Sequence, residues 1–381
     1  MLIQAEKYKA AEVKFSVAKQ LPMTEVERCI YYVELSKLRF NQFFLSFGKC
    51  DRIAVFQEAV TCLSPTGSKA SNGSKTTLKD VFLNGQKQLV QLETLLYEAF
   101  TESCKSGTPI DAEEIGHKIT EICLFKASVL QRNVSFAEPL FALEYPKSIY
   151  NHREKENMIS KISFEKLASN FKSEVDDHLR DDFVVCTLNI NGNVLYLSRL
   201  EKGENLLYKL PLGRIAIRDG CINGSGMNFQ DTMDEFARIM SINRETTTNA
   251  KYCTTSSEKK AWLSTRKQLD KSLENLLENI ENSWLSGFRG LLSDKIILKC
   301  HVFDNFRART EKMITGYLRR CFNSKTAGIE LDDALCKTIL RLGTDPQFED
   351  LEDILYYILD CYQLKGVLIE YDELNIEDVR L

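Results

Sequence analysis

The chain has 381 residues, of which 44% are hydrophobic and 27% charged, and its formal net charge is −4. These are ordinary values for a globular protein, and the length is sufficient for two or three domains. The charge is too evenly balanced to indicate nucleic-acid binding, and no apolar run reaches the roughly eighteen residues that a membrane span needs.

The helical part comes first. Residues 1–150 are predicted to form a solenoid-like helical region, and Thr24 with Glu27 has the spacing of a helix-capping box. The Ser-, Gly- and Lys-rich stretch 64–77 predicts a flexible loop within this region, and residues 151–181 predict a linker helix. Apolar residues recur at three- and four-residue steps in 5–21, 25–47, 78–102 and 111–130.

A change in residue composition at residue 182 predicts a β-hairpin. The segments 183–190 (FVVCTLNI) and 193–200 (NVLYLSRL) are rich in β-branched and apolar residues, and Asn191-Gly192 separates them. Asn-Gly between two such runs favours a type I′ turn, in which both central residues have positive φ. Residues 206–212 (LLYKLPL) are consistent with a third strand.

The hairpin is followed by a predicted helix at 230–243, a polar and mobile stretch at 246–257, and one long amphipathic helix from Lys259 to Leu292. We expect this long helix to lie across the small β-layer and to bury both tryptophans of the chain. The residues of the long helix that we assign to a structural role are Trp262, Arg266, Leu269, Asp270, Leu273, Leu277 and Trp284. Later helices are predicted at 303–322, 331–342 and 348–364, and 366–371 is either a strand or the frayed end of the last helix.

Residue chemistry alone gives no catalytic site. A cysteine protease needs a thiolate and a nearby base, which is nearly always histidine. We interpret the four histidines, His117, His152, His178 and His301, as surface or structural residues. The cysteines form no C-x-x-C pair, which argues against zinc, and no cofactor motif is present, so catalytic, cofactor and metal residues are predicted to be none.

The long segment nevertheless has a particular form. W-x3-R-x2-LD-x2-L-x2-LL-x2-IE, followed by F-x-GLL, resembles a segment of separase, the cysteine endopeptidase that opens cohesin at anaphase. Earlier stretches agree in order and spacing over about 110 residues. They are the hairpin with RLEK at 199–202, LPLG at 210–213, and the helix DTMDEFARIMSI at 231–242.

The resemblance implies a mainly α fold, with a helical-repeat region followed by a smaller α/β part. Residues 182–381 would then be the caspase-like pseudo-protease domain, the non-catalytic half of the separase protease unit. The family's His-Gly and Gly-Cys-Ser segments have no counterpart in this sequence, so no catalytic residue is carried over and we expect the chain to be inactive alone.

Several partners follow from the same resemblance: a securin-like inhibitor, the kleisin subunit of cohesin as a substrate cut after arginine, and the catalytic half of the protease. It places the protein in nucleus and cytoplasm around the spindle, without direct contact to nucleic acid or membrane, and the Lys- and Asn-rich composition is consistent with a fungal member. The main alternative is a helical scaffold or interaction module. A third hypothesis keeps activity in this chain through Cys253 or Cys300.

Overall fold

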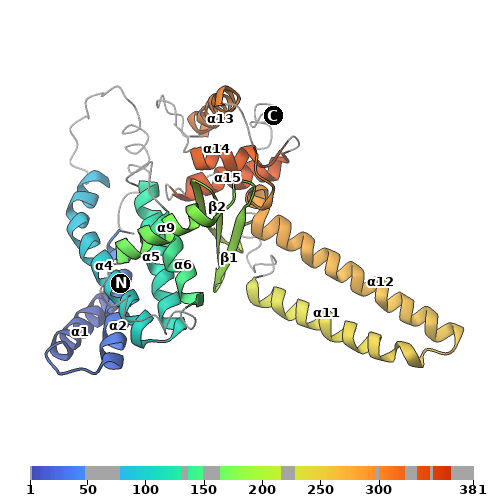
Figure 1. Cartoon of the computed structure of the whole chain (residues 1–381), viewed down its shortest axis with the longest axis horizontal. Helices are drawn as coiled ribbons and strands as arrows, with labels where there is room; N and C mark the ends of the chain where they lie inside the picture. The colour runs from blue at the N-terminus through green and yellow to red at the C-terminus, as the bar shows by residue number, and fades with distance from the viewer. Residues whose placement is uncertain are drawn as a thin grey trace.

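The computed structural model describes residues 2–47, 78–129, 136–148, 164–215, 228–296, 300–321, 333–343 and 346–361. Figure 1 shows an antiparallel sheet between two sets of helices, with a long helical hairpin that projects from one end of the body. The predicted loop 64–77 and the segment 366–371 lie outside the described residues. Within the described residues, no helix is long and apolar enough to cross a membrane.

The N-terminal helices form one layer with its own core. Thr24 and Glu27 make the predicted capping box, because each side chain accepts a hydrogen bond from the other residue's backbone N–H at 3.3 and 2.8 Å. Leu96, Phe100 and Ile119 are among the apolar residues that fill this core. The elements are α1 (Leu2–Ala18), α2 (Glu25–Phe47), α4 (Leu78–Ser106), α5 (Pro109–Val129), α6 (Ala137–Glu144), the 3₁₀ turn η1 (Tyr145–Ser148) and α9 (Phe164–His178).

The sheet is a meander of three antiparallel strands, β1 (Val185–Asn191), β2 (Val194–Glu201) and β3 (Glu204–Pro211). The third strand is therefore confirmed. The predicted turn is one residue out of place: Asn191 pairs with Val194, so the loop is Gly192-Asn193, and only Gly192 has positive φ (58°). A positive φ at the first central residue alone is the type II′ pattern, so the type I′ prediction is wrong.

Both faces of the central strand are covered, and the side chains along β2 alternate between the two faces. Leu195 and Leu197 point into the core shared with the C-terminal helices. Tyr196 and Leu200 point the other way, into a smaller cluster with Leu140 of α6. The sheet is thus the middle layer between α5, α6 and α9 on one side and the C-terminal helices on the other (Figure 1).

The projecting hairpin consists of α11 (Phe229–Asn249) and α12 (Ser256–Asn279), joined by the short 3₁₀ turn η3 (Ala250–Tyr252). Residues 246–257 were expected to be mobile and polar, but α11 continues through their first part. Thr255 and Glu258 then start α12 with a capping box. Figure 1 shows that both helices point away from the sheet.

The predicted single helix 259–292 is broken. After α12 the chain makes a π-helical turn, η4 (Ile280–Leu285), and then a 3₁₀ segment, η5 (Ser286–Leu292). Ser286 marks the break, because its φ of 41° is incompatible with a right-handed helix. Only the part after Asn279 packs on the sheet, where Phe288 and Leu291 are fully buried.

Three helices complete the layer on the far side of the sheet: α13 (Cys300–Cys321), α14 (Asp333–Leu340) and α15 (Phe348–Cys361). They lie close to the predicted ranges. Phe306, Ile339 and Leu351 are buried in the core that Leu195 and Leu197 enter from the sheet. The domain boundaries proposed from the sequence stay predictions.

Candidate functional site

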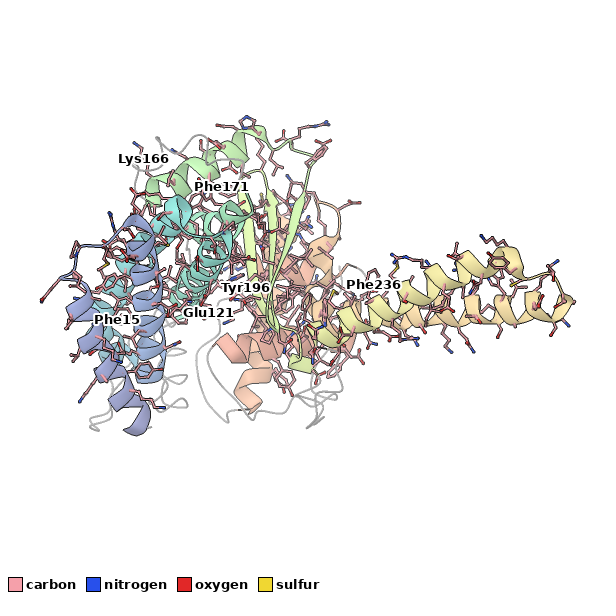
Figure 2. All side chains as sticks on the ribbon, turned by 90° about the horizontal axis from the view of Figure 1, so that it is seen from below. Phe15, Glu121, Lys166, Phe171, Tyr196 and Phe236 are labelled. Atoms are coloured by element: carbon pink, nitrogen blue, oxygen red, sulfur yellow. The ribbon has the colours of Figure 1, made fainter. Side chains whose placement is uncertain are left out.

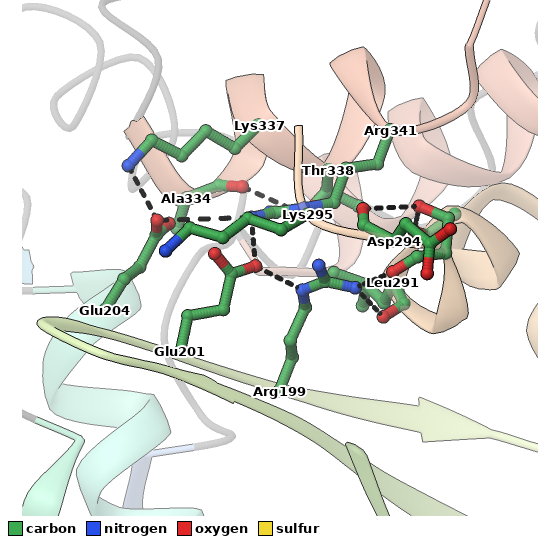
Figure 3. Close-up of polar contacts among 12 residues, drawn as sticks. Arg199, Glu201, Glu204, Leu291, Asp294, Lys295, Ala334, Lys337, Thr338 and Arg341 are labelled. Atoms are coloured by element: carbon green, nitrogen blue, oxygen red, sulfur yellow. Dashed lines mark hydrogen bonds and ion pairs between the residues drawn. The ribbon is translucent and has the colours of Figure 1, made fainter. Parts of the chain in front are cut away.

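The most unusual feature of the sheet is a buried charged cluster at one end of β2 (Figure 3). Arg199 and Glu201 share the strand face of Leu197, and the Arg199 Nε donates to Glu201 Oε1 at 2.6 Å. Arg341, at the end of α14, donates to the same carboxylate oxygen at 2.9 Å. The second guanidinium nitrogen of Arg199 donates to the carbonyl of Leu291, so the cluster joins the sheet to η5 and α14.

The cluster holds more positive than negative charge in its interior. Arg199, Glu201 and Arg341 are all less than a tenth exposed. Burial opposes ionisation of Glu201, but the hydrogen bond from Arg199 and the charge of Arg341 outweigh it and lower the pKa of this carboxyl. A second pair at the rim, Lys337 and Glu204 at 2.9 Å, continues the network toward solvent. Glu201 is therefore the nearest anion to both buried cations, and Glu204 lies 4.0 Å from Arg341 as a second, more distant partner.

A second buried ion pair joins the loop after β3 to α15. Arg214 Nε and Nη2 donate to the two carboxylate oxygens of Asp353 at 2.9 and 2.6 Å, a bidentate geometry. The same guanidinium donates to the carbonyls of Trp284 and Leu285 at 2.8 and 3.2 Å. These carbonyls lie at the end of η4, where helical hydrogen bonding stops, so Arg214 satisfies a helix end that the fold buries.

Glycines allow η5 to approach its neighbours closely. A Cβ on Gly287 would lie 2.3 Å from the backbone oxygen of Asp350, and one on Gly290 would lie 2.5 Å from that of Arg341. Both distances are far below van der Waals contact, so only glycine fits at these positions. Beside this contact Arg289 pairs with Asp350 at 2.6 Å, although burial raises the pKa of the Asp350 carboxyl.

The other face of the sheet contacts the helical layer through α5. Glu121 accepts from Lys209 of β3 and from the Tyr196 hydroxyl of β2, the latter at 3.4 Å. Figure 2 shows Glu121 and Tyr196 close together between these elements. One helical turn earlier, the His117 ring lies 5.0 Å from the ring of Tyr196, and its burial lowers the histidine pKa to about 4.

The thiols and histidines do not approach one another in the contacts that the described residues show. Cys29 donates to Ser103, and Cys186 donates to the Leu291 carbonyl at 3.2 Å. Burial raises the pKa of both thiols, which makes them poor nucleophiles at neutral pH. His178 bonds its own helix at the Glu174 carbonyl, and His117 faces Tyr196.

The cysteines of the third hypothesis have exposed or half-exposed positions. Cys253 follows η3 at the tip of the hairpin, and its Sγ contacts the Asn249 carbonyl at 3.6 Å. Cys300 is the exposed first residue of α13, next to the exposed His301. Adjacent helical residues point in different directions, so these two do not form a nucleophile and base. His152 lies outside the described residues, and no group of described residues is arranged to hold a metal ion.

The structure separates the seven predicted structural residues of the long segment. Trp284 is buried in the sheet core. Trp262 and Arg266 instead contact α11, through hydrogen bonds to the Thr246 carbonyl and the Asn243 side chain. Leu269 is buried within the hairpin, whereas Asp270, Leu273 and Leu277 are exposed. The expectation that the whole segment covers the sheet is wrong for α12, because α11 provides the partner for its apolar stripe.

Sequence reasoning did not assign a role to the charged residues that join the layers. Arg199 and Glu201 lie at the strand positions that alternate in step with Leu195 and Leu197, so the i, i+2 spacing was an available signal. Arg214 and Asp353 carry no such local pattern. Chemically, these groups bind carbonyls and carboxylates of the same chain, and they thereby connect the sheet to its C-terminal helices.

Comparison with known proteins identifies the same region. The family model described as "Separin, protease domain" matches residues 190–381. The curated separin of Schizosaccharomyces pombe is 29% identical over 273 residues, which cover 65% of this chain and 15% of that protein. The separin of Emericella nidulans is 32% identical over 231 residues, covering 57% and 11%. That of Saccharomyces cerevisiae is 28% identical over 264 residues, covering 62% and 16%. The chain thus spans less than a fifth of the length of each relative.

Solved structures agree on the fold. The chain is similar to two crystal structures of the Saccharomyces cerevisiae separase–securin complex, at 3.0 and 2.6 Å resolution, with TM-scores of 0.61 and 0.56. Sequence identity is 18% in both, and the matches cover 92% and 91% of this chain and 24% of those chains. The predicted fold class, a helical-repeat-like region followed by a caspase-like arrangement, is confirmed.

Proposed function

Because this chain belongs to the separin family, we propose that it forms the helical and pseudo-protease part of a separase-like cysteine endopeptidase, without catalytic residues of its own. The observation that carries the proposal is the match of the separin protease-domain model to residues 190–381. That range contains β2, β3 and the end of β1, together with the hairpin and the helices α13 to α15.

The proposed reaction belongs to the complete protease. It is hydrolysis of the kleisin subunit of cohesin after an arginine, which separates sister chromatids, under the control of a securin-like inhibitor. The similar solved structures are of a separase–securin complex, which supports an inhibitor of this kind for the chain. We also propose nuclear and cytoplasmic localisation around the spindle, which a fluorescent fusion imaged through mitosis would test.

The role proposed for this chain is mechanical. The hydrogen bond from Arg199 to the Leu291 carbonyl fixes η5 against the sheet, and the ion pair Arg214–Asp353 fixes α15 to the segment after β3. A rigid platform holds a neighbouring catalytic unit in one geometry, and misplacement of about 1 Å in an active site costs roughly a hundredfold in rate. The raised pKa values of the Cys29 and Cys186 thiols support a role in positioning the catalytic unit rather than in nucleophilic attack.

A chimera tests this proposal. The aligned segment of the Schizosaccharomyces pombe separin is replaced by this chain, and cleavage of kleisin is measured alongside the isolated chain acting on a fluorogenic peptide with arginine at the cleaved bond. We expect kleisin cleavage by the chimera and no turnover by the chain alone. Glu201→Gln in the chimera should reduce cleavage, whereas Ile110→Ala, at an exposed position of α5, should not.

The alternatives give different results. A chimera that is folded but inactive would favour the helical scaffold. Turnover by the isolated chain that alkylation stops, and that Cys253→Ser or Cys300→Ser removes, would show activity within this chain and would overturn the proposal.

A further inference from the structure

The hairpin of α11 and α12 has a small core and several exposed large apolar side chains. Its own core contains Ile239, Leu269 and Leu276. Among its exposed large apolar side chains are five that are each between 37% and 55% exposed: Met233, Phe236 and Met240 on α11, and Leu273 and Leu277 on α12. Figure 2 shows Phe236 on the hairpin, outside the main body of the protein. A projecting arm with this composition is a candidate interaction surface.

The five side chains form a single face. On each helix, these side chains point about 50–110° away from the side that faces the other helix. The rotation is in the direction in which the chain winds as the residue number increases. The helices are antiparallel, so the same rotation turns both stripes to the same side of the hairpin. The contacts Trp262–Thr246 and Arg266–Asn243 set the register, which puts Leu273 level with Phe236. We call these five residues the apolar face.

The opposite side of the hairpin is polar. A groove of about 400 Å³ runs between the two helices there, and Arg238, Gln268 and Ser272 line it. The hairpin is therefore two-sided, and its packing does not require apolar residues on the outside. The exposed residues are not a by-product of the contact between α11 and α12, because that contact is already made by the inner stripe.

The charges beside the apolar face change sign along the hairpin, from positive near its tip to negative near its base. Toward the tip lie Arg244 and Lys259, and toward the base lie Asp270 and Glu274, all exposed. None of the four makes an ion pair within the described part of the chain. On α12, Lys259 near the start and Asp270 and Glu274 in the second half oppose the helix dipole, which favours the reverse order, whereas Arg244 near the end of α11 agrees with it. The helix dipole therefore does not account for the charges that α12 contributes to this pattern.

We propose that the apolar face binds one amphipathic α-helix of a partner protein, with acidic residues over the tip of the hairpin and basic residues over its base. The partner helix would complete a three-helix bundle with α11 and α12. The hairpin is about 36 Å long and about 20 Å wide, so one face offers roughly 700 Å². This is close to the roughly 800 Å² per partner of a standard interface. The inference goes beyond the proposed protease role and does not depend on it.

Designed helices test the charge rule with the whole chain. Two fluorescent peptides of about 21 residues carry the same leucine stripe and the same composition. The first has its acidic residues in one half and its basic residues in the other, and the second has them interspersed. We expect the charge-segregated peptide to bind at least about tenfold more tightly by fluorescence anisotropy, because only it pairs both ends of the face.

Matched variants locate the site. Phe236→Glu combined with Leu273→Glu should weaken binding at least about tenfold, because it places charge in the apolar face. Gln268→Glu combined with Ser272→Glu adds the same charge on the polar side and should leave binding unchanged. All four positions are exposed or half-buried, and circular dichroism melts check that both variants fold.

Three results would overturn the proposal. They are equal binding of the two peptides, undiminished binding by the Phe236 and Leu273 variant, and absence of binding by either peptide. Sedimentation velocity measures whether the chain associates with itself. If it does, and if the Phe236 and Leu273 variant does not, the apolar face binds a second copy of this chain in place of a partner helix.

Discussion

The buried imidazole of His117 makes stability depend on pH at the contact between α5 and the sheet. Burial lowers its pKa from 6.5 to about 4. Between these values the unfolded chain binds a proton that the folded chain does not, so stability is complete above pH 6.5 and falls as the pH drops toward 4. A shift of this size corresponds to about 3 kcal/mol, of which about 2 kcal/mol is lost by pH 5.

His117→Leu and His117→Gln remove the titrating group. Each variant also lacks the hydrogen bond to the Glu113 carbonyl, which lowers its unfolding free energy by about 1 kcal/mol at every pH. This constant loss cancels when the unfolding free energies at two pH values are compared. Urea unfolding followed by circular dichroism, at about pH 7.5 and about pH 5, gives the loss for each protein. We expect both variants to lose about 2 kcal/mol less than the unmodified chain over this interval. Equal losses in all three proteins would refute the assignment of the pH dependence to His117.

Three further predictions concern the C-terminal layer. Glu201→Gln should cost about 3–5 kcal/mol of unfolding free energy, and Arg341→Met clearly less, because the first leaves buried Arg199 without an anion and Arg341 with only the more distant Glu204, at 4.0 Å. Urea midpoints decide, and the reverse order would contradict this charge count. Gly287→Ala should lower the melting temperature by several degrees, since its Cβ meets the Asp350 backbone oxygen at 2.3 Å; an unchanged melt would mean that η5 shifts freely. Trp284→Ala should cost about 3–5 kcal/mol and Leu277→Ala under about 1 kcal/mol; similar costs would place the two residues in similar environments.

Local sequence signals predicted most elements of the fold. Thr24 with Glu27 identified a helix start, and the β-branched runs around Gly192 identified the hairpin. The error at the turn is instructive, because Asn191-Gly192 and Gly192-Asn193 are overlapping pairs and both favour a two-residue loop. Register is decided by which strand residues enter the core, and here Leu195 and Leu197 fix it one residue further along.

The long segment shows where periodicity stops being informative. Apolar residues at three- and four-residue steps predict that one side of a helix is covered, but not by which element. Trp262 and Leu269 are covered by α11, which the sequence predicted as a separate shorter helix. The exposed Leu273 and Leu277 continue the stripe outward, so a sequence pattern alone assigns them to a core that the hairpin does not have.

The charged residues of the candidate site lay beyond sequence reasoning for a different reason. Arg199 binds a carbonyl 92 residues away, and Glu201 binds an arginine 140 residues away. Alternation along β2 assigns both side chains to the buried face, and a buried charge requires a partner. It does not identify that partner, because the Leu291 carbonyl lies at the end of η5 and its position depends on how the chain folds after the break at Ser286. The break and the ionic cluster are linked in this way: the turn at Ser286 directs η5 onto the sheet, and the carbonyls at the end of η5, of Leu291 and Ser293, accept from Arg199 where helical hydrogen bonding stops.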